Sequence, residues 1–597
     1  MQKITSQLAQ GGTTRRQPRI AELAVVSDRR TCALLDQQGT LCWYCPRQFD
    51  SAAVFAQLLD AEKGGFWAVE AAGQQFGHRA YLERSSILTT HFVGAAGGFA
   101  LTDWMPLDAP FTGLCRQFSA APVPVVNTIR LRPNYGLETT QTQLLADGYT
   151  AAFAEVGLWL RASHPLRQVG DCLQFIIPAG AEGWAVLTDT PGAAQMLDAL
   201  QLGAAFEHTA QAWRTLAALL QYEGPYEQQV QDSIRAVQQL TFAETGGIVA
   251  AATTSLPEVL GGARNYDYRY VWMRDVSMIV GALTQLDEVG QVEQSFLNFI
   301  AKALRENEQP RLAPFYTVDK KLIKHLQKLD LAGYQRSRPV QIGNTAYDQL
   351  QLDADANVLV AAKLLYDRFG EKKEWATVVQ IADFLTENWQ RDDNGIWEEG
   401  KTKAYTSSKV FAARGLEFIA AYADTPAQAG RWQAAARAIR QFVQQNCLTT
   451  SGAYAVYPGS EEVDVTAVLF AHWTYCAPDS PEMLATIREI ETHWCRENLY
   501  WRRLEEFDSH QEGAFLASTC WMAHYYAFAG QPARARAILE ATLRYQNDLG
   551  FFAEEAGLSQ GEQMLGNFPQ TFVHSSFICA ANGLKMALQG KDSRVHV

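Results

Sequence analysis

Long apolar runs are missing from this sequence. No segment reaches the roughly 18 apolar residues that a membrane-spanning helix needs, and the N-terminal stretch MQKITSQLAQGGTTRRQPRIAELAVV has no apolar run of signal-peptide length. An excess of basic residues is missing too, because the formal net charge is -13 at pH 7. Nucleic acid and anionic membranes both require a basic face, so neither is expected as a partner. We expect a cytoplasmic protein that acts on a neutral small molecule.

Metal-binding patterns are also missing. The sequence has no HExxH motif and no paired His or Cys spacing of the kind that holds zinc. Cys42 and Cys45 form a CxxC without a second one to complete a zinc site, so a redox or metal role for them is the minor alternative. The 10 cysteines are scattered, as is typical of buried, reduced thiols. We expect no metal.

The first third of the chain has the pattern of β-strands. Short segments that are rich in branched residues and bounded by Gly, Pro or Asp surround Cys32, Leu88 and Ile129. This pattern predicts an N-terminal β-sandwich over residues 1–205. The apolar period then becomes helical, which predicts a helical linker over residues 206–224.

The remainder, residues 225–597, is predicted to be almost entirely helical, with about twelve amphipathic segments. Their centres include Ile279, Phe299, Leu359, Ile381, Ala412, Ile439, Leu469, Ile487, Ala523, Ala537 and Ala580. Six helix pairs suit a closed (α/α)6 barrel, although the count alone also fits an open solenoid. The lack of a short TPR or HEAT repeat favours the barrel. The predicted fold is therefore an N-terminal β-sandwich followed by a C-terminal (α/α)6 helical barrel that carries the catalytic site.

The run RNYDYRYVWMRD at 264–275 is dense in both aromatic and charged residues. It contains four aromatics, three arginines and two aspartates. A sugar pocket needs both kinds, because rings stack on the C–H face of a sugar while Arg and Asp hold its hydroxyls. A buried structural ion network is an equally good interpretation of this composition.

Two glutamate doublets follow apolar residues in loops between predicted helices. Glu398 and Glu399 lie in NGIWEEGK, directly after Trp397, and Glu554 and Glu555 lie in GFFAEEAG. Such doublets are usually solvated surface. However, glycoside hydrolysis requires two carboxyl groups from different loops, one to protonate the leaving oxygen and one to attack or to activate water. In an inverting enzyme we expect them about 6.5–9.5 Å apart.

Several longer blocks together resemble one family. The run TTSLPEVLGGARNYDYRYVWMRD at 253–275 is similar to the signature segment of glycoside hydrolase family 15, the glucoamylase and bacterial trehalase family. Further blocks resemble the family in the same order: GIWE at 395–398, SKV at 408–410, EG at 512–513 and LGNFPQ at 565–570. DQQGTLCWYCPRQFDS at 36–51 resembles its leading β-domain, so the resemblance spans nearly the whole chain.

The resemblance implies a role for each matching residue. Glu398 matches the general acid, Glu554 looks like the general base, and Glu399 matches a position that contacts the sugar beyond the cleaved bond. The residues implied to surround the terminal glucose are Arg274 and Asp275, which hold hydroxyls, and Tyr268 and Trp272, which wall the subsite. Glu398 has to stay protonated near neutral pH, and Trp397 is the apolar wall expected to help it do so.

The activity implied is that of an inverting exo-acting α-glucoside hydrolase, which releases β-glucose from α-gluco-oligosaccharides or disaccharides and requires no cofactor. The doublet at 398–399 favours glucoamylase-like enzymes. Trehalase is the alternative, and a non-catalytic glycan-binding protein on the same fold is a remote one. The chain departs from the usual family pattern in EGKTKAYTS at 399–407 and in ADAN at 354–357, which leaves the leaving group of the substrate open. Oligomeric state is not indicated.

Overall fold

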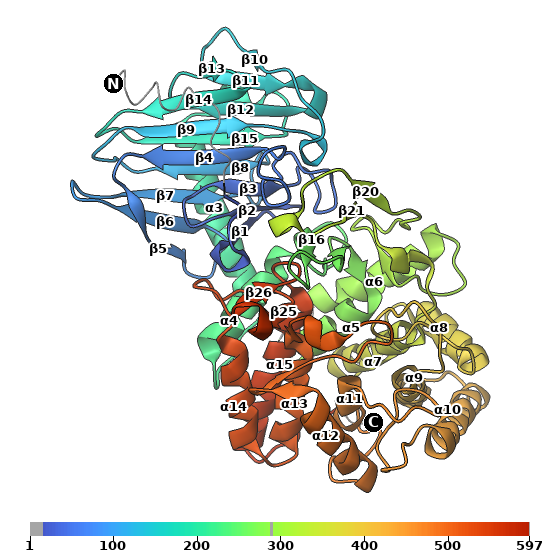
Figure 1. The fold of residues 1–597 in the computed structure, drawn as a ribbon. Helices are drawn as coiled ribbons and strands as arrows, with labels where there is room; N and C mark the ends of the chain where they lie inside the picture. Colours follow the sequence, from blue (N-terminus) through green and yellow to red (C-terminus); the bar gives the residue numbers. More distant parts are fainter. Residues whose placement is uncertain (1–15, 287–290, 596–597) are drawn as a thin grey trace. The chain divides into compact units, whose positions relative to one another are not determined.

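The computed structural model describes residues 16–286 and 291–595, which form two compact units (Figure 1). The first unit comprises Met1–Ala218 together with Gln238–Leu240 and Leu329–Val340. The second comprises Leu219–Val237, Thr241–Lys328 and Gln341–Val597. The domain limits that the sequence suggested, at 205 and 224, remain a prediction.

The first unit is built on two antiparallel sheets. Among the described residues, one sheet has the order β1-β2-β3-β4-β9-β14-β13 and the other has the order β10-β11-β12-β15-β8-β7-β6-β5. The strands are β1 (Ala24–Ser27), β2 (Cys32–Leu35), β3 (Leu41–Tyr44), β4 (Phe66–Ala71), β5 (Gln75–Tyr81), β6 (Leu88–Val93), β7 (Phe99–Trp104), β8 (Leu114–Phe118), β9 (Val125–Arg130), β10 (Gln143–Leu144), β11 (Thr150–Phe153), β12 (Leu158–Ala162), β13 (Arg167–Val169), β14 (Cys172–Ile177) and β15 (Gly183–Thr188). The predicted β-sandwich is confirmed.

Alternating side chains explain why these segments form a sandwich. In β6, Leu88 and Phe92 are buried on one face, while the residues between the buried positions are partly exposed. A buried arginine links the two sheets: Arg116 of β8 pairs with Asp103 of the neighbouring β7 at 2.7 Å and donates to the Trp67 carbonyl of β4 in the other sheet. Strand pairing and core packing therefore require the same register between neighbouring strands.

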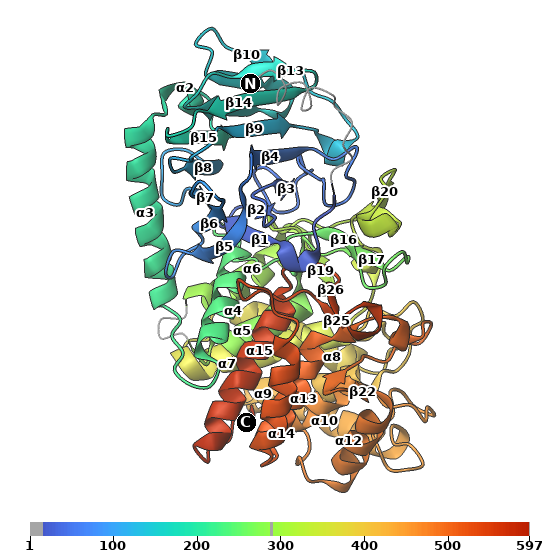
Figure 2. The same cartoon turned by 60° about the vertical axis from the view of Figure 1, so that its left-hand side comes forward.

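Helix α3 (Ala199–Ala218) lies alongside the second sheet, as Figure 2 shows, after the short helix α2 (Ala193–Met196). Its buried Leu202 and Ala205 join a core cluster with Trp104 and Val186 of that sheet. This apolar contact fixes the helix on the face of the sandwich.

The second unit contains a closed ring of helices. Within the described residues, α5 packs on α7, α7 on α9, α9 on α11, α11 on α13, α13 on α15, and α15 packs back on α5. Outside this ring, α6, α8, α10, α12 and α14 each pack against the inner helix that precedes them. The helices are α4 (Glu227–Gln239), α5 (Met273–Leu283), α6 (Gln291–Glu306), α7 (Leu352–Phe369), α8 (Trp375–Asn388), α9 (Thr406–Ala420), α10 (Pro426–Asn446), α11 (Val468–His472), α12 (Pro481–His493), α13 (Leu516–Phe528), α14 (Pro532–Leu543) and α15 (Thr571–Leu588). Ring closure confirms the predicted (α/α)6 barrel and excludes the open solenoid.

Burial separates the inner helices from the outer ones. Helix α13 is buried on every side from Leu516 to Ala527, whereas α14 buries one face that includes Ala535 and Ile538. A helix that is apolar all round belongs inside a larger core, and an amphipathic one belongs at the surface. None of the helices in the described part of the chain is both long and apolar enough to cross a membrane.

Short strands lie in the loops of the barrel unit. Strand β16 (Thr254–Pro257) pairs with β17 (Asn265–Asp267), and β18 (Val271–Trp272) pairs with β19 (Phe315–Tyr316). A three-stranded sheet is formed by β24 (Ala514–Phe515), β25 (Glu555–Gly557) and β26 (Gln563–Leu565). The other short strands are β20 (Gln327–Leu329), β21 (Val340–Ile342), β22 (Cys495–Arg496) and β23 (Leu499–Tyr500). Strands β16 to β18 lie in the run at 253–275, β25 begins at the second glutamate of the second doublet, and β26 ends at the start of the LGNFPQ block.

Candidate active site

A cavity of about 960 Å³ opens among the loops of the barrel unit. Trp272 and Gln570, which line it, are the N-cap residues of the inner helices α5 and α15. The lining also includes every residue for which the sequence predicted a site role, namely Tyr268, Trp272, Arg274, Asp275, Trp397, Glu398, Glu399 and Glu554. Residues from four separate segments of the chain therefore meet in one pocket.

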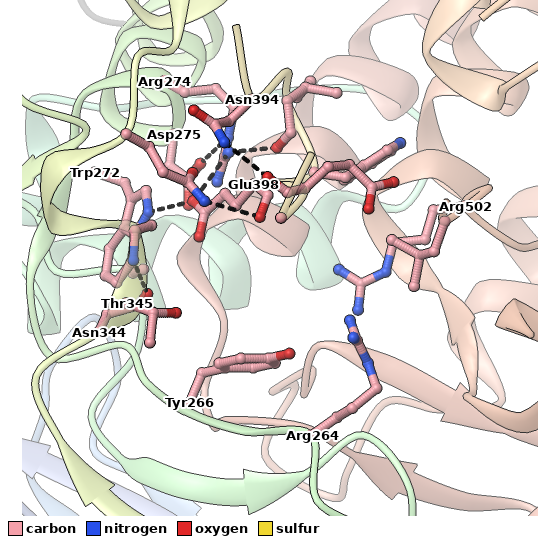
Figure 3. Close-up of a pocket in the computed structure, with 18 of the residues that line it drawn as sticks. Arg264, Tyr266, Trp272, Arg274, Asp275, Asn344, Thr345, Asn394, Glu398 and Arg502 are labelled. Carbon is pink, nitrogen blue, oxygen red and sulfur yellow. Dashed lines mark hydrogen bonds and ion pairs between the residues drawn. The ribbon is translucent and has the colours of Figure 1, made fainter. Parts of the chain in front are cut away.

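Arg274 and Asp275 occupy the first turn of α5 and face the pocket together with Glu398 (Figure 3). The Arg274 guanidinium donates to Asp275 Oδ1 at 2.7 Å and to the Ile396 carbonyl at 2.5 Å. Its Nη1 also lies 3.3 Å from Glu398 Oε1. One guanidinium thus ties the start of α5 to the loop that carries the first doublet.

The loop that carries the first doublet is held by side-chain amides. Asn394 donates to the Glu399 carbonyl at 2.8 Å, and Gln349 donates to the Glu398 carbonyl at 3.0 Å. The backbones of Asp393 and Lys403 exchange two hydrogen bonds of 2.9 Å and so close the base of the loop. Glu398 itself has a φ of +58°, in the left-handed region, which a non-glycine residue adopts only when its surroundings enforce it.

Glu398 is set against an aromatic wall. The Trp272 indole donates to Glu398 Oε1 at 2.6 Å, and the Trp272 ring stacks on Phe315 with centroids 4.5 Å apart. Burial raises the pKa of Glu398, while the Arg274 charge and the Trp272 hydrogen bond partly oppose that shift. A carboxyl group with a raised pKa can remain protonated at a pH where ordinary glutamates are ionised.

Glu554 lies at the end of the second apolar run, just before β25. The Tyr268 hydroxyl donates to its Oε1 at 3.1 Å, whereas its buried Oε2 has no hydrogen-bond partner among residues 16–286 and 291–595. A Cβ added at Gly566, where φ is +75°, would lie 2.6 Å from that Oε2. Burial raises the pKa of Glu554 to about 8, helped by the charge of Glu258 and opposed by that of Arg502.

The two pocket carboxyl groups are joined through an aromatic pair. Tyr268 contacts Glu554 and Trp272 contacts Glu398, and the two rings meet edge to face with centroids 5.3 Å apart. Each carboxyl group is therefore fixed by its own ring, and the ring pair separates the two groups. The predicted spacing of 6.5–9.5 Å for an inverting enzyme stays a prediction.

Glu555 turns away into a buried ion cluster. Arg502 Nη2 lies 2.9 Å from Glu258, 3.2 Å from Glu512 and 3.1 Å from Glu555, and Arg264 also pairs with Glu258 and Glu512. Carboxylate oxygens of these three glutamates lie within 4.8 Å of one another, a grouping that could hold a metal ion. Here the Arg502 guanidinium supplies the positive charge among them.

Different members of the run at 264–275 take different places in the structure. Tyr268, Trp272 and Arg274 line the pocket, while Arg269 and Asp267 form a fully buried ion pair at 2.8 Å. Pocket lining and a buried ion pair alternate along the same segment, and the sugar-binding role stays a prediction.

The pocket also contains residues that the sequence analysis missed. The lining includes Tyr266, Asn344, Gln349, Arg502 and Phe507. Figure 3 shows Tyr266, Arg264 and Arg502 facing Trp272 and Glu398 across the pocket. Tyr266 lies within the aromatic run and could have been included on that signal. Arg502 lies in WRRLEEFD, where no local pattern distinguishes a buried arginine from a surface one.

Comparison with known proteins places this geometry in a family. The family model "Glycosyl hydrolases family 15" matches residues 224–582, and "Trehalase-like, N-terminal" matches residues 12–163. The chain is 27% identical to a protein named trehalase from Thermoplasma volcanium, over 97% of this chain and 96% of the relative. It is 28% identical to trehalase 2 of Sulfolobus acidocaldarius, over 93% and 98% of the two chains.

A solved structure shares the whole architecture. The crystal structure of a bacterial glucoamylase complexed with acarbose superposes with a TM-score of 0.71 at 12% identity, over 97% of this chain and 95% of that one. At that identity the likeness shows the fold alone, and the fold agrees with the sandwich and barrel described above. The family model matches more than half of the chain. This chain therefore belongs to glycosyl hydrolases family 15 and is a glycoside hydrolase.

Proposed function

We propose that this protein hydrolyses the terminal glucosidic bond of an α-glucoside with inversion, releasing β-glucose. The observation that supports it most directly is the contrast between the two pocket carboxyl groups. Glu398 is held by Trp272 and Arg274, and Glu554 keeps one buried oxygen for which the described part of the chain supplies no partner. An acid that is already positioned and a base with a free oxygen are the two components that inverting hydrolysis requires.

In the proposed reaction the two groups act on opposite faces of the sugar. Glu398 donates its proton to the glycosidic oxygen as the bond from that oxygen to the anomeric carbon breaks. Glu554 accepts a proton from a water molecule whose oxygen forms the new bond from the other face. The products are β-glucose and the leaving alcohol, and no electrons are exchanged. No cofactor enters the reaction.

The remaining predicted residues bind the substrate in this proposal. Arg274 and Asp275 hold the hydroxyls of the terminal glucose, because a guanidinium and a carboxylate at the pocket base offer a charged donor and acceptor. Tyr268 and Trp272 wall the same subsite, and Trp397 and Glu399 lie on the side of the next sugar. The partner is thus a small neutral α-glucoside rather than a nucleic acid, and we propose a cytoplasmic location and the predicted domain limits at 205 and 224.

Two substrate classes remain, each with an observation in its favour. Glu399, the second residue of the first doublet, lines the pocket and favours a glucoamylase-like preference for α-gluco-oligosaccharides. The curated relatives named above carry the name trehalase, which favours α,α-trehalose. The leaving group is glucose in both cases when a disaccharide is cleaved, so the difference lies in the linkage.

A product assay by proton NMR tests the proposal. Purified protein is mixed with maltose, maltotriose, isomaltose, kojibiose, nigerose or trehalose, and the anomeric signals are read within minutes. Early β-glucose from a linear glucoside supports the first substrate class, and turnover of trehalose alone supports the second. Early α-glucose alone from a linear glucoside contradicts inversion, and binding of sugars without turnover would point to a non-catalytic glycan-binding protein.

A further inference from the structure

Both neighbours of Glu398 are linked to one segment of the pocket rim, Glu399 directly and Trp397 through Asp464. The Trp397 indole donates to Asp464 Oδ2 at 2.9 Å, and Glu399 Oε1 accepts the backbone N–H of Glu505 at 2.8 Å. The rim segment 502–507 lines the pocket through Arg502, Leu504, Glu506 and Phe507. The loop with the predicted acid is therefore tied to this rim from both sides of Glu398.

Asp464 is the centre of these ties. It is 3% exposed, and its carboxylate accepts hydrogen bonds from three places in the chain. Oδ2 accepts from the Trp397 indole at 2.9 Å, from the Thr466 N–H at 3.0 Å and from the Thr466 hydroxyl, while Oδ1 accepts from the Arg503 N–H at 2.8 Å. The Thr466 bonds cap a 3-10 turn that leads into α11, so the carboxylate itself is anchored to the barrel.

We infer that Asp464 is a positioning residue for the proposed reaction, which couples the placement of Glu398 to the rim that receives the leaving group. This inference rests on the proposed function. Asp464 does not line the main pocket, but it contacts Trp397 directly before Glu398 and Arg503 at the start of the rim segment. A shift of either contact moves the acid relative to the leaving oxygen.

Two carboxylates, those of Asp464 and Glu399, bind backbone N–H groups of the rim segment. Arg503 and Glu505 are alternate residues, and their N–H groups are bound by Asp464 and Glu399 respectively. Lys401 and Glu506 form an exposed ion pair at 2.9 Å between the same loop and rim, and such a pair contributes little in water. The two buried backbone contacts therefore carry most of the coupling.

Asp464→Asn is a sharp test because three donors meet at Oδ2 and one at Oδ1. The amide oxygen is expected to stay with the three donors, so the amide NH₂ group then faces the Arg503 N–H. Two donors cannot bond to each other, and the rim contact is lost while the size of the side chain is kept. Thr466→Val weakens the coupling from the barrel side, since it removes the hydroxyl that donates to Oδ2 and keeps the size of the side chain.

The measurement compares two substrates in each variant. One is the disaccharide that the wild type cleaves fastest, and the other is α-glucosyl fluoride, whose small leaving group needs neither a rim nor a strong proton donor. We expect Asp464→Asn to lose on the order of 100-fold in kcat/KM on the disaccharide, as for a small displacement of a catalytic group, and Thr466→Val to lose about tenfold. On α-glucosyl fluoride they should stay within about threefold of the wild type.

The matched control is Asp28→Asn in the sandwich. Asp28 is 4% exposed and its Oδ1 accepts the N–H groups of Arg30 and Thr31, so asparagine keeps these bonds, and both activities should be unchanged. Equal losses on both substrates in a folded variant, or no loss on either, would overturn the inference. If Asp464→Asn fails to fold, Thr466→Val alone decides. A wild type that cleaves neither substrate would instead refute the proposed function.

Discussion

The two glutamate doublets have the same letters and opposite surroundings. Glu398 and Glu399 both line the pocket, whereas Glu554 lines it and Glu555 lies among buried arginine contacts. The backbone explains the difference. Glu398 has a left-handed φ of +58° within a turn, and Glu555 begins strand β25, where neighbouring side chains point to opposite faces.

This comparison teaches that adjacency along the chain does not set a shared role. In the turn, two carboxyl groups can serve one pocket at neighbouring positions. Beside the strand, the same pair is divided between the pocket and a structural ion cluster. Substitution of each glutamate in turn tests this division of roles, and the largest effect is expected at Glu554.

Glu554→Gln should lower kcat on the preferred glucoside by about 10⁴-fold, because a neutral amide cannot accept the proton of the attacking water. Glu555→Gln is its matched control, and we expect a loss within about tenfold. Burial, together with the charges of Glu512 and Glu258, raises the pKa of Glu555 well above its ordinary value, and a glutamine there keeps an oxygen that can accept from Arg502. Steady-state kinetics and thermal unfolding measure both variants.

The stability of Glu555→Gln should fall by only about 1–2 kcal/mol, since Arg502 keeps Glu258 and Glu512 as partners. Azide added to Glu554→Ala should form a glycosyl azide of inverted configuration. A variant of Glu555 that is as inactive as the Glu554 variant would exchange the roles of the two residues.

Glu398→Gln should lower kcat on disaccharides by about 10³-fold while substrate binding persists. Its matched control, Glu399→Gln, keeps an oxygen that can accept the Glu505 N–H, so we expect a change of about three- to tenfold, mainly in KM. Pre-steady-state kinetics and binding titrations separate the two effects. Near-normal turnover by Glu398→Gln would remove that residue from the mechanism.

The smallest predicted effect is on the pH profile. The base must be ionised, so kcat/KM falls as the pH drops through the pKa of Glu554, which burial raises to about 8. The acid must be protonated, so activity also falls as the pH rises through the raised pKa of Glu398. Glu258→Gln removes a negative neighbour of Glu554 and should move the acid-side limb down by about one unit.

The basic-side limb should stay in place in Glu258→Gln, because Glu258 raises the pKa of Glu554, while the pKa of Glu398 is set mainly by burial, Arg274 and Trp272. The profile is measured as kcat/KM over pH 4 to 10 on one substrate. Movement of both limbs together would contradict separate environments for the two carboxyl groups.

The fold could be predicted largely because its signals are local. Apolar periods of two and of 3.6 residues recur along the chain, and each predicted helix centre falls within an observed helix. The centre near Leu469 shows the limit, since α11 covers only Val468–His472. Closure of the ring could not be deduced from such periods, because it depends on the contact of α15 with α5 across the whole unit.

The pocket could be predicted where the sequence concentrates unusual residues. The predicted residues come from the dense run at 264–275 and from the two doublets with Trp397, and all of them line one cavity. Arg502 and Asp464 could not be found in this way. Each is defined by contacts with distant residues, such as Arg502 with Glu258 and Asp464 with Trp397, and nothing in their own neighbourhoods indicates burial.

The position of the Glu554 carboxyl group depends on the space that Gly566 leaves beside it as well as on the charges around it. The space beside Oε2 exists because residue 566 ends at its α-carbon, and a single methyl group there would occupy it. Adding one carbon atom at position 566 would therefore displace the Glu554 carboxyl group without altering any charge in the protein.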